Sequence, residues 1–162
     1  MLVLALGNPI LCDDGVAFHV LDRMRARLPE GDDLVLEEAS TGGIDLLNHV
    51  IGFDKVLLID AIKTAGGEPG QVRTFDEGDF KETLHASSTH SVNFSTAMEL
   101  GRALRPGQMP AEIAILAIEA GVVDCFDEEL TPEVRKAVPK AASAALGILR
   151  RWGIGVDQGA MP

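Results

Sequence analysis

The sequence predicts a three-layer α/β/α fold built on a mainly parallel, twisted sheet of about five strands. Two observations lead to this prediction. Short apolar segments of strand length alternate along the chain with segments of helical periodicity. Most of the apolar segments are hydrophobic at nearly every position, which is typical of strands buried on both faces by helices. With 162 residues, of which 46% are hydrophobic, the chain is long enough for one domain with a substantial core.

Five segments have the length and composition of strands: residues 2–6, 34–39, 55–62, 71–75 and 112–120. The fourth segment alternates polar and apolar residues, and we therefore expect it at an edge of the sheet. Only 4% of the residues are aromatic, so aliphatic side chains and alanine must fill the interior.

Helical periodicity appears between the strands. An apolar stripe predicts a helix from about Gly15, with Asp13 or Asp14 as its cap. Residues 44–51 are predicted to form a short helix. A further helix is expected after His90, with its apolar residues facing inward: Ala97, Leu100 and Leu104.

The last predicted helix begins at the sequence Thr131-Pro132-Glu133, in which threonine is expected to cap and proline to occupy the first helical position. It runs to about Trp152, and Pro139 is expected to kink it. We predict one α/β domain over residues 1–152 and a flexible tail over 153–162. Residues 76–90 show no clear period and are interpreted as a surface loop.

Charge and composition narrow the classes of function. The net charge of −11 argues against nucleic-acid binding, because phosphate recognition needs lysine and arginine, and it favours a basic partner or solubility alone. The two cysteines lack CxxC spacing, which argues against a disulfide framework or zinc knuckle. No apolar run approaches a membrane span, and no basic segment precedes the first apolar run as in a signal peptide. We therefore expect a cytoplasmic location without membrane contact.

Asp60 is the first candidate site residue because it interrupts an otherwise apolar strand near its carboxyl end, where α/β proteins place their sites. It is either a carboxylate that accepts bonds from loop amides or a functional ligand or acid–base group. Asp13 and Asp14 follow the first strand at the start of a helix. One can cap the helix while the other points into the crevice, and Asp14 lies closer to the helix.

His90 follows two possible capping residues and is either a surface histidine or a ligand. Together, Asp14, Asp60 and His90 would form an oxygen–oxygen–nitrogen set, which suits a divalent metal such as nickel or zinc. Cys12 with His90 and an aspartate is a weaker, cysteine-hydrolase alternative, because neighbouring acids disfavour the thiolate.

Four segments together resemble the hydrogenase maturation proteases, the endopeptidases that process the large subunit of nickel–iron hydrogenases. These segments are LGNPILCDDG at 6–15, STGG at 40–43, LIDA at 58–61 and STH at 88–90. The resemblance covers nearly the whole chain. The position of Asp14 is glutamate in some members of the family, and aspartate is one methylene shorter.

The resemblance implies an α/β/α fold and a metal site formed by Asp14, Asp60 and His90, with Asp14 and Asp60 as catalytic residues. It also implies that Gly42 and Gly43 form a substrate-binding loop. The implied activity is removal of a C-terminal extension from the hydrogenase large-subunit precursor after nickel insertion. Nickel would then arrive with the substrate, and zinc or cadmium could occupy the same site. A nickel-binding chaperone without peptidase activity, or a peptidase for an unrelated precursor, is the alternative.

Overall fold

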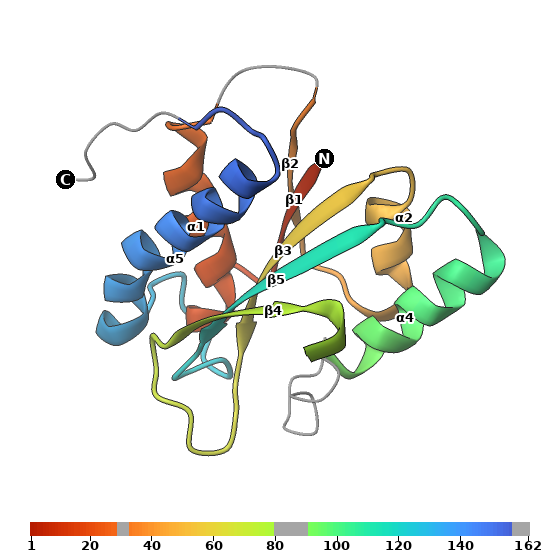
Figure 1. The fold of residues 1–162 in the computed structure, drawn as a ribbon. Helices are drawn as coiled ribbons and strands as arrows, with labels where there is room; N and C mark the ends of the chain where they lie inside the picture. The colour runs from red at the N-terminus through yellow and green to blue at the C-terminus, as the bar shows by residue number, and fades with distance from the viewer. Residues whose placement is uncertain (29–32, 80–90, 157–162) are drawn as a thin grey trace.

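The computed structural model describes residues 1–28, 33–79 and 91–156 (Figure 1). All five predicted strands form, each within one residue of its predicted bounds. The elements in chain order are β1 (Leu2–Leu6), α1 (Val16–Arg25), β2 (Val35–Ala39), α2 (Leu47–Val50), β3 (Lys55–Ile62), β4 (Val72–Asp76), α4 (Ser91–Leu104), β5 (Glu112–Glu119) and α5 (Pro132–Arg151). A 3₁₀ helix over Cys12–Gly15 precedes α1, and another over Gly43–Leu46 precedes α2.

The strands form one sheet in the order β2-β1-β3-β5-β4. Neighbouring strands are parallel except that β4 pairs antiparallel with β5. The predicted mainly parallel sheet and the predicted edge position of the fourth strand are therefore confirmed. The chain runs from β1 outward to β2 and then returns to place β3 on the other side of β1. Ligand sites of α/β proteins form at the carboxyl ends of strands at such a reversal of order.

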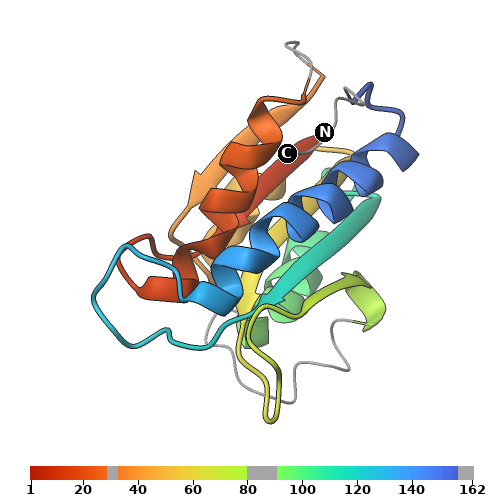
Figure 2. The same cartoon turned by 90° about the vertical axis from the view of Figure 1, so that its left-hand side faces the viewer.

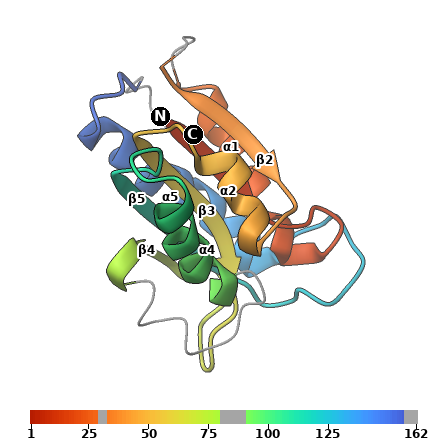
Figure 3. The same cartoon turned by 90° about the vertical axis from the view of Figure 1, so that its right-hand side faces the viewer.

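Helices cover both faces of this sheet, with α1 and α5 on one face and α2 and α4 on the other (Figures 1 and 3). Alternate strand residues face the two layers, as in any pleated strand. Leu57 and Ile59 pack in the core beneath α1 and α5, whereas Leu58 packs in the core beneath α2 and α4. Each such aliphatic side chain contributes roughly 1.5–3 kcal/mol to folding on burial. Phe94 is the single aromatic residue of the described buried core, so aliphatic side chains do fill it.

The helix after His90 forms as predicted, but its expected inward stripe is only partly correct. Ala97 is buried, Leu100 is partly buried, and 63% of Leu104 is exposed to solvent. Leu104 is the last residue of α4, where the helix ends and the chain turns toward β5. The apolar periodicity therefore predicted a buried stripe that is one helical turn longer than the buried face of α4.

The predicted cap of α1 is wrong. Asp13 and Asp14 lie inside the 3₁₀ helix, α1 has Gly15 as its N-cap residue, and no side chain caps it. Thr131 is the N-cap residue of α5 and Pro132 begins the helix, as predicted, but the Thr131 side chain makes no capping hydrogen bond. The Thr131 hydroxyl instead donates a hydrogen bond to the Asp13 carboxylate at 3.0 Å, because this buried anion is the stronger acceptor.

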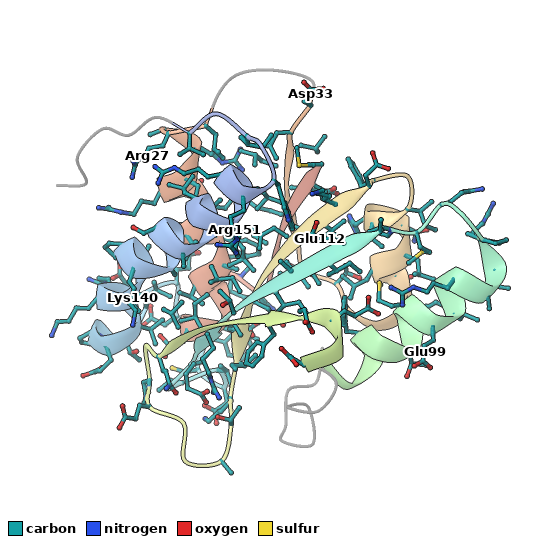
Figure 4. The ribbon with its side chains drawn as sticks, in the orientation of Figure 1. Arg27, Asp33, Glu99, Glu112, Lys140 and Arg151 are labelled. Atoms are coloured by element: carbon teal, nitrogen blue, oxygen red, sulfur yellow. The ribbon has the colours of Figure 1, made fainter. Side chains whose placement is uncertain are left out.

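Charged side chains such as Glu99 and Lys140 project from the outer faces of the helices (Figure 4). No helix in the described ranges is long and apolar enough to cross a lipid bilayer. After α5, the side chains of Ile154 and Val156 pack against the core, and residues 157–162 lie outside the described residues. The single domain over 1–152 and the flexible tail stay predictions. The loop expected over 76–90 is wrong at its start, because Asp76 is the last residue of β4 and residues 77–79 are helical, while residues 80–90 lie outside the described residues.

Candidate active site

Asp60 is a buried carboxylate near the carboxyl end of β3, with 4% of its surface exposed. Its Oδ1 atom is buried and has no hydrogen-bond partner among the described residues. Burial raises the pKa of Asp60 to about 8, the charge of Asp14 adds to this rise, and the backbone amide of Ala61 opposes it. A buried carboxylate that lacks a full set of donors is costly, so this arrangement favours a functional role over a purely structural one.

Asp14 is partly exposed and belongs to the 3₁₀ helix that follows β1. The backbone N–H of Asn8 donates a 2.8 Å hydrogen bond to Asp14 Oδ2, which orients the carboxylate. Gly7 makes this close approach possible: a Cβ atom at Gly7 would lie 2.0 Å from the Asp14 carbonyl oxygen, and its φ of +152° is one that other residues rarely adopt. The Gly7-Asn8 pair therefore holds the turn that presents Asp14.

The fold brings Asp14 and Asp60 to the same point, the switch between β1 and β3. The charge of Asp14 contributes to the raised pKa of Asp60, and two neighbouring carboxylates repel each other unless a proton or cation is shared. Asp60 follows Leu58 by two residues and so faces the layer of α2 and α4. This pair of hard oxygen ligands fits a divalent cation, since one buried oxygen has no partner in the part of the chain that the structure describes.

The third predicted ligand, His90, lies outside the described residues. Helix α4 begins at the next residue, Ser91, and covers the face of the sheet to which Asp60 belongs. Within the described ranges, no group of three or more potential ligands is close enough to hold a metal ion. The three-residue metal site therefore stays a prediction.

Gly42 and Gly43, the predicted substrate-binding loop, follow the carboxyl end of β2. Gly42 is extended, with φ −158°, and Gly43 has φ +63° in the left-handed region that glycine adopts readily. This conformation turns the chain into the 3₁₀ helix that begins at Gly43. The role of the loop in binding stays a prediction.

Asp13 joins the active-site turn to the loop between β5 and α5. Its carboxylate is fully buried and accepts hydrogen bonds from the amides of Gly121 (2.9 Å), Val122 (3.0 Å) and Thr131 (2.8 Å), and from the Thr131 hydroxyl. Figure 2 shows this loop beside the turn after β1. Asp13 therefore neither caps α1 nor points into the crevice, but binds the backbone of this loop.

Comparison with known proteins identifies the family. The family model described as hydrogenase maturation protease matches residues 18–148 of the chain. The chain belongs to this family. It is therefore a hydrogenase maturation endopeptidase, as the resemblance of its motifs implied.

Individual relatives agree with this assignment. The protease is 24% identical to the hydrogenase expression/formation protein HupD of Bradyrhizobium diazoefficiens over 164 residues, which cover 100% of the chain and 84% of HupD. It is 22% identical to the hydrogenase 2 maturation protease of Escherichia coli, over 95% and 93% of the two chains.

Solved structures show the same fold. The Escherichia coli hydrogenase maturating endopeptidase HybD superposes with a TM-score of 0.84 at 21% identity, over 96% of this chain and 94% of HybD. The [NiFe] hydrogenase maturation protease HybD from Thermococcus kodakarensis superposes with a TM-score of 0.74 at 30% identity, over 91% of this chain and 97% of that HybD. The predicted fold class is confirmed.

Glu119 at the end of β5 is a third buried acid of the protease, after Asp13 and Asp60, and sequence reasoning did not select it. Only 1% of it is exposed, and it accepts hydrogen bonds from the Thr64 hydroxyl (2.8 Å) and the Arg73 guanidinium (2.6 Å). A Cβ atom at Gly67 would lie 2.2 Å from its carboxylate. Glu119 therefore organises the loop between β3 and β4. An acidic residue ending an apolar strand, the signal used for Asp60, would have found it.

The protease has two free cysteines, of which Cys12 is buried and Cys125 exposed. Burial, the nearby Cys125 and the charges of Asp127 and Asp13 together raise the pKa of Cys12 to about 11. At neutral pH this thiol is almost entirely protonated and is a poor nucleophile.

Cys12→Ser is therefore expected to retain most of the processing activity. The substitution is small, and serine fits the volume that the thiol occupies. Precursor cleavage by wild type and variant, followed on denaturing gels, measures the effect. Complete loss of cleavage with an unchanged circular dichroism spectrum would favour the cysteine-hydrolase alternative.

Proposed function

We propose that this protease removes a C-terminal extension from the nickel-loaded large-subunit precursor of a nickel–iron hydrogenase, and that Asp14, Asp60 and His90 hold the nickel during cleavage. The observation that carries the proposal is the buried Oδ1 of Asp60, which has no partner among residues 1–28, 33–79 and 91–156 and lies beside Asp14 at the switch between β1 and β3. Membership of the family supplies the substrate class. We also propose that the protease acts in the cytoplasm.

The properties of Asp60 suit acid–base chemistry near neutral pH. A general base works best when its pKa lies near the operating pH, and the pKa of Asp60 is raised to about 8 in the free protein. A divalent cation would lower this pKa on arrival, because it stabilises the carboxylate. Nickel carried by the precursor would polarise the scissile carbonyl and acidify a bound water. Asp60 or Asp14 would accept the proton that this water loses when it attacks the carbonyl carbon, and would return it to the amine that leaves when the peptide C–N bond breaks.

The Gly42-Gly43 loop is proposed to contact the backbone of the substrate. Glycine has no Cβ, and an extended substrate segment approaches it more closely than it approaches other residues. The loop follows β2, whose carboxyl end lies beside that of β1, so it borders the same edge of the sheet.

Cleavage is expected to require nickel in the substrate. The candidate ligands number three and include no resident set such as HExxH, so the metal, with its remaining ligands, should come from the precursor. Purified protease is incubated with nickel-loaded precursor, nickel-free precursor and casein, and only the first should be shortened. Added zinc or cadmium should inhibit by occupying Asp14, Asp60 and His90.

The same incubation separates the alternatives. Binding of the nickel-loaded precursor without cleavage would favour a nickel-binding chaperone. If the nickel-loaded precursor is neither bound nor cleaved, the result would favour a peptidase for another precursor. Efficient cleavage of the nickel-free precursor would contradict the proposed role of nickel.

A further inference from the structure

Phe126 is an unusual residue for this protein, because 84% of a large aromatic side chain is exposed in a chain that has few aromatics. Ile10 is 46% exposed and lies beside it in the fold: the amide of Asp127 donates to the Ile10 carbonyl at 3.1 Å. We call Ile10 and Phe126 the apolar ridge. Exposed apolar side chains that lie together are typical of interaction sites.

The backbone on both sides of the ridge is held in place. Leu11 forms a parallel bridge with Asp127, and the amide of Cys12 donates to the Asp127 carbonyl at 2.7 Å. Asp13 binds the amides of Gly121 and Val122 at the start of the same loop. Phe126 is therefore presented to solvent by a braced loop, and less conformational entropy is lost when a partner covers it.

Acidic residues surround the ridge. Its loop, residues 121–131, contains four acids and no lysine or arginine, and we call these acids the acidic rim: Asp124, Asp127, Glu128 and Glu129. All four are exposed. A cavity of about 440 Å³ adjoins the ridge and is lined by Pro9 and Glu128, the neighbours of Ile10 and Asp127. An aromatic anchor with a charged border and an adjacent recess has the anatomy of a protein-binding surface.

We propose that the apolar ridge and acidic rim are the docking surface for the hydrogenase precursor, which offers an apolar recess bordered by lysine and arginine side chains. This inference rests on the proposed function. Its location supports it, since Ile10 lies four residues from Asp14 on the turn that leads to the active site. A precursor docked here would be anchored beside the two aspartates. The negative rim would steer a basic surface toward them.

The test compares Phe126→Ala with a matched control, Leu104→Ala. Leu104 is also a large exposed apolar residue, 63% exposed, but it ends α4 near the amino end of β5, away from the active site. With nickel-loaded precursor, Phe126→Ala should raise KM at least about tenfold and leave kcat within about twofold, as expected for an anchor residue. Leu104→Ala should change neither constant. Melting temperatures should match wild type, because both side chains lie outside the core.

Charge reversal tests the acidic rim separately. Glu128→Lys should raise KM several-fold at low salt, with a smaller effect at 0.5 M NaCl, and Glu99→Lys on the outer face of α4 should not. An unchanged KM in Phe126→Ala would overturn the inference, and so would an equal rise in Leu104→Ala. A dimer of wild type that Phe126→Ala dissociates in sedimentation would also overturn it, since a second copy would then cover the ridge.

The outcomes distinguish the two proposals. If wild type binds the precursor without cleaving it, the proposed function fails, while the dissociation constants of the same variants still decide whether the ridge docks it. If wild type cleaves and Phe126→Ala cleaves with the same KM, only the ridge fails. Wild type that neither binds nor cleaves would overturn both.

Discussion

Asp60→Asn should abolish cleavage of the nickel-loaded precursor and at the same time stabilise the free protein. Asparagine keeps the shape of the side chain but cannot accept a proton or bind a cation as a carboxylate does. Loss of a positioned acid–base group typically costs two to four orders of magnitude in rate, and we expect a loss of about 10³-fold or more. Asp60→Asn and His90→Ala should both lose nickel binding.

The gain in stability depends on pH. Asp60 holds its proton more tightly in the folded state, with a pKa of about 8, than its ordinary value of 3.8. Its protonated form therefore stabilises the fold fully below about pH 4, and this contribution is lost as pH rises toward about 8. Asparagine has no such dependence. The free energy of unfolding of the variant should exceed that of wild type increasingly from pH 5 to pH 8, and the difference should grow by roughly 4 kcal/mol over this range.

Urea denaturation of both proteins at pH 5, 6, 7 and 8, without metal, measures this difference. Asp54→Asn is the matched control because Asp54 is exposed and directly precedes the same strand at its amino end. The control should show neither effect. Equal stability of wild type and Asp60→Asn across this range would contradict the raised pKa, and retained cleavage would contradict the catalytic role. Calorimetry with nickel then tests binding in Asp60→Asn and His90→Ala.

Substitutions of the neighbouring aspartates should separate catalysis from stability. Asp14→Asn should abolish cleavage while stability stays nearly unchanged, since the asparagine oxygen can still accept the hydrogen bond from the Asn8 amide. Removal of the Asp14 charge should also lower the pKa of Asp60, because that charge contributes to its rise. Asp14→Glu should recover part of the activity if ligand identity matters more than reach.

Asp13→Asn should lower stability and retain cleavage. The Asp13 carboxylate accepts four hydrogen bonds in a fully buried position, and asparagine offers one oxygen in place of two. We expect a loss of about 3 kcal/mol, more than the roughly 1 kcal/mol typical of a helix cap. Cleavage should persist at temperatures where the variant is folded. If Asp13→Asn abolishes cleavage and Asp14→Asn does not, the ligand assignment is wrong by one residue.

The sequence by itself determined the strands, the class of the sheet and the position of Asp60. Strand length and unbroken apolar composition are local properties, and strands buried on both faces need helices on both sides, so residues 2–6 and 55–62 were predictable. A carboxylate that interrupts such a run needs a hydrogen-bond partner, a cation or a proton to offset the cost of its burial. The motifs around Asp14 and Asp60 also identified the family correctly.

Only the tertiary structure decided which groups meet. Asp13 binds Thr131, 118 residues further along the chain, and no local pattern indicates that partner. The raised pKa of Asp60 depends on burial and on the approach of Asp14, both of which arise from packing. Leu104 fits a helical period and is nevertheless exposed, while Phe126 is exposed in a loop that a bridge between Leu11 and Asp127 holds in place. Exposure and hydrogen-bond partners are set by contacts between distant segments, and periodicity reports only on neighbours.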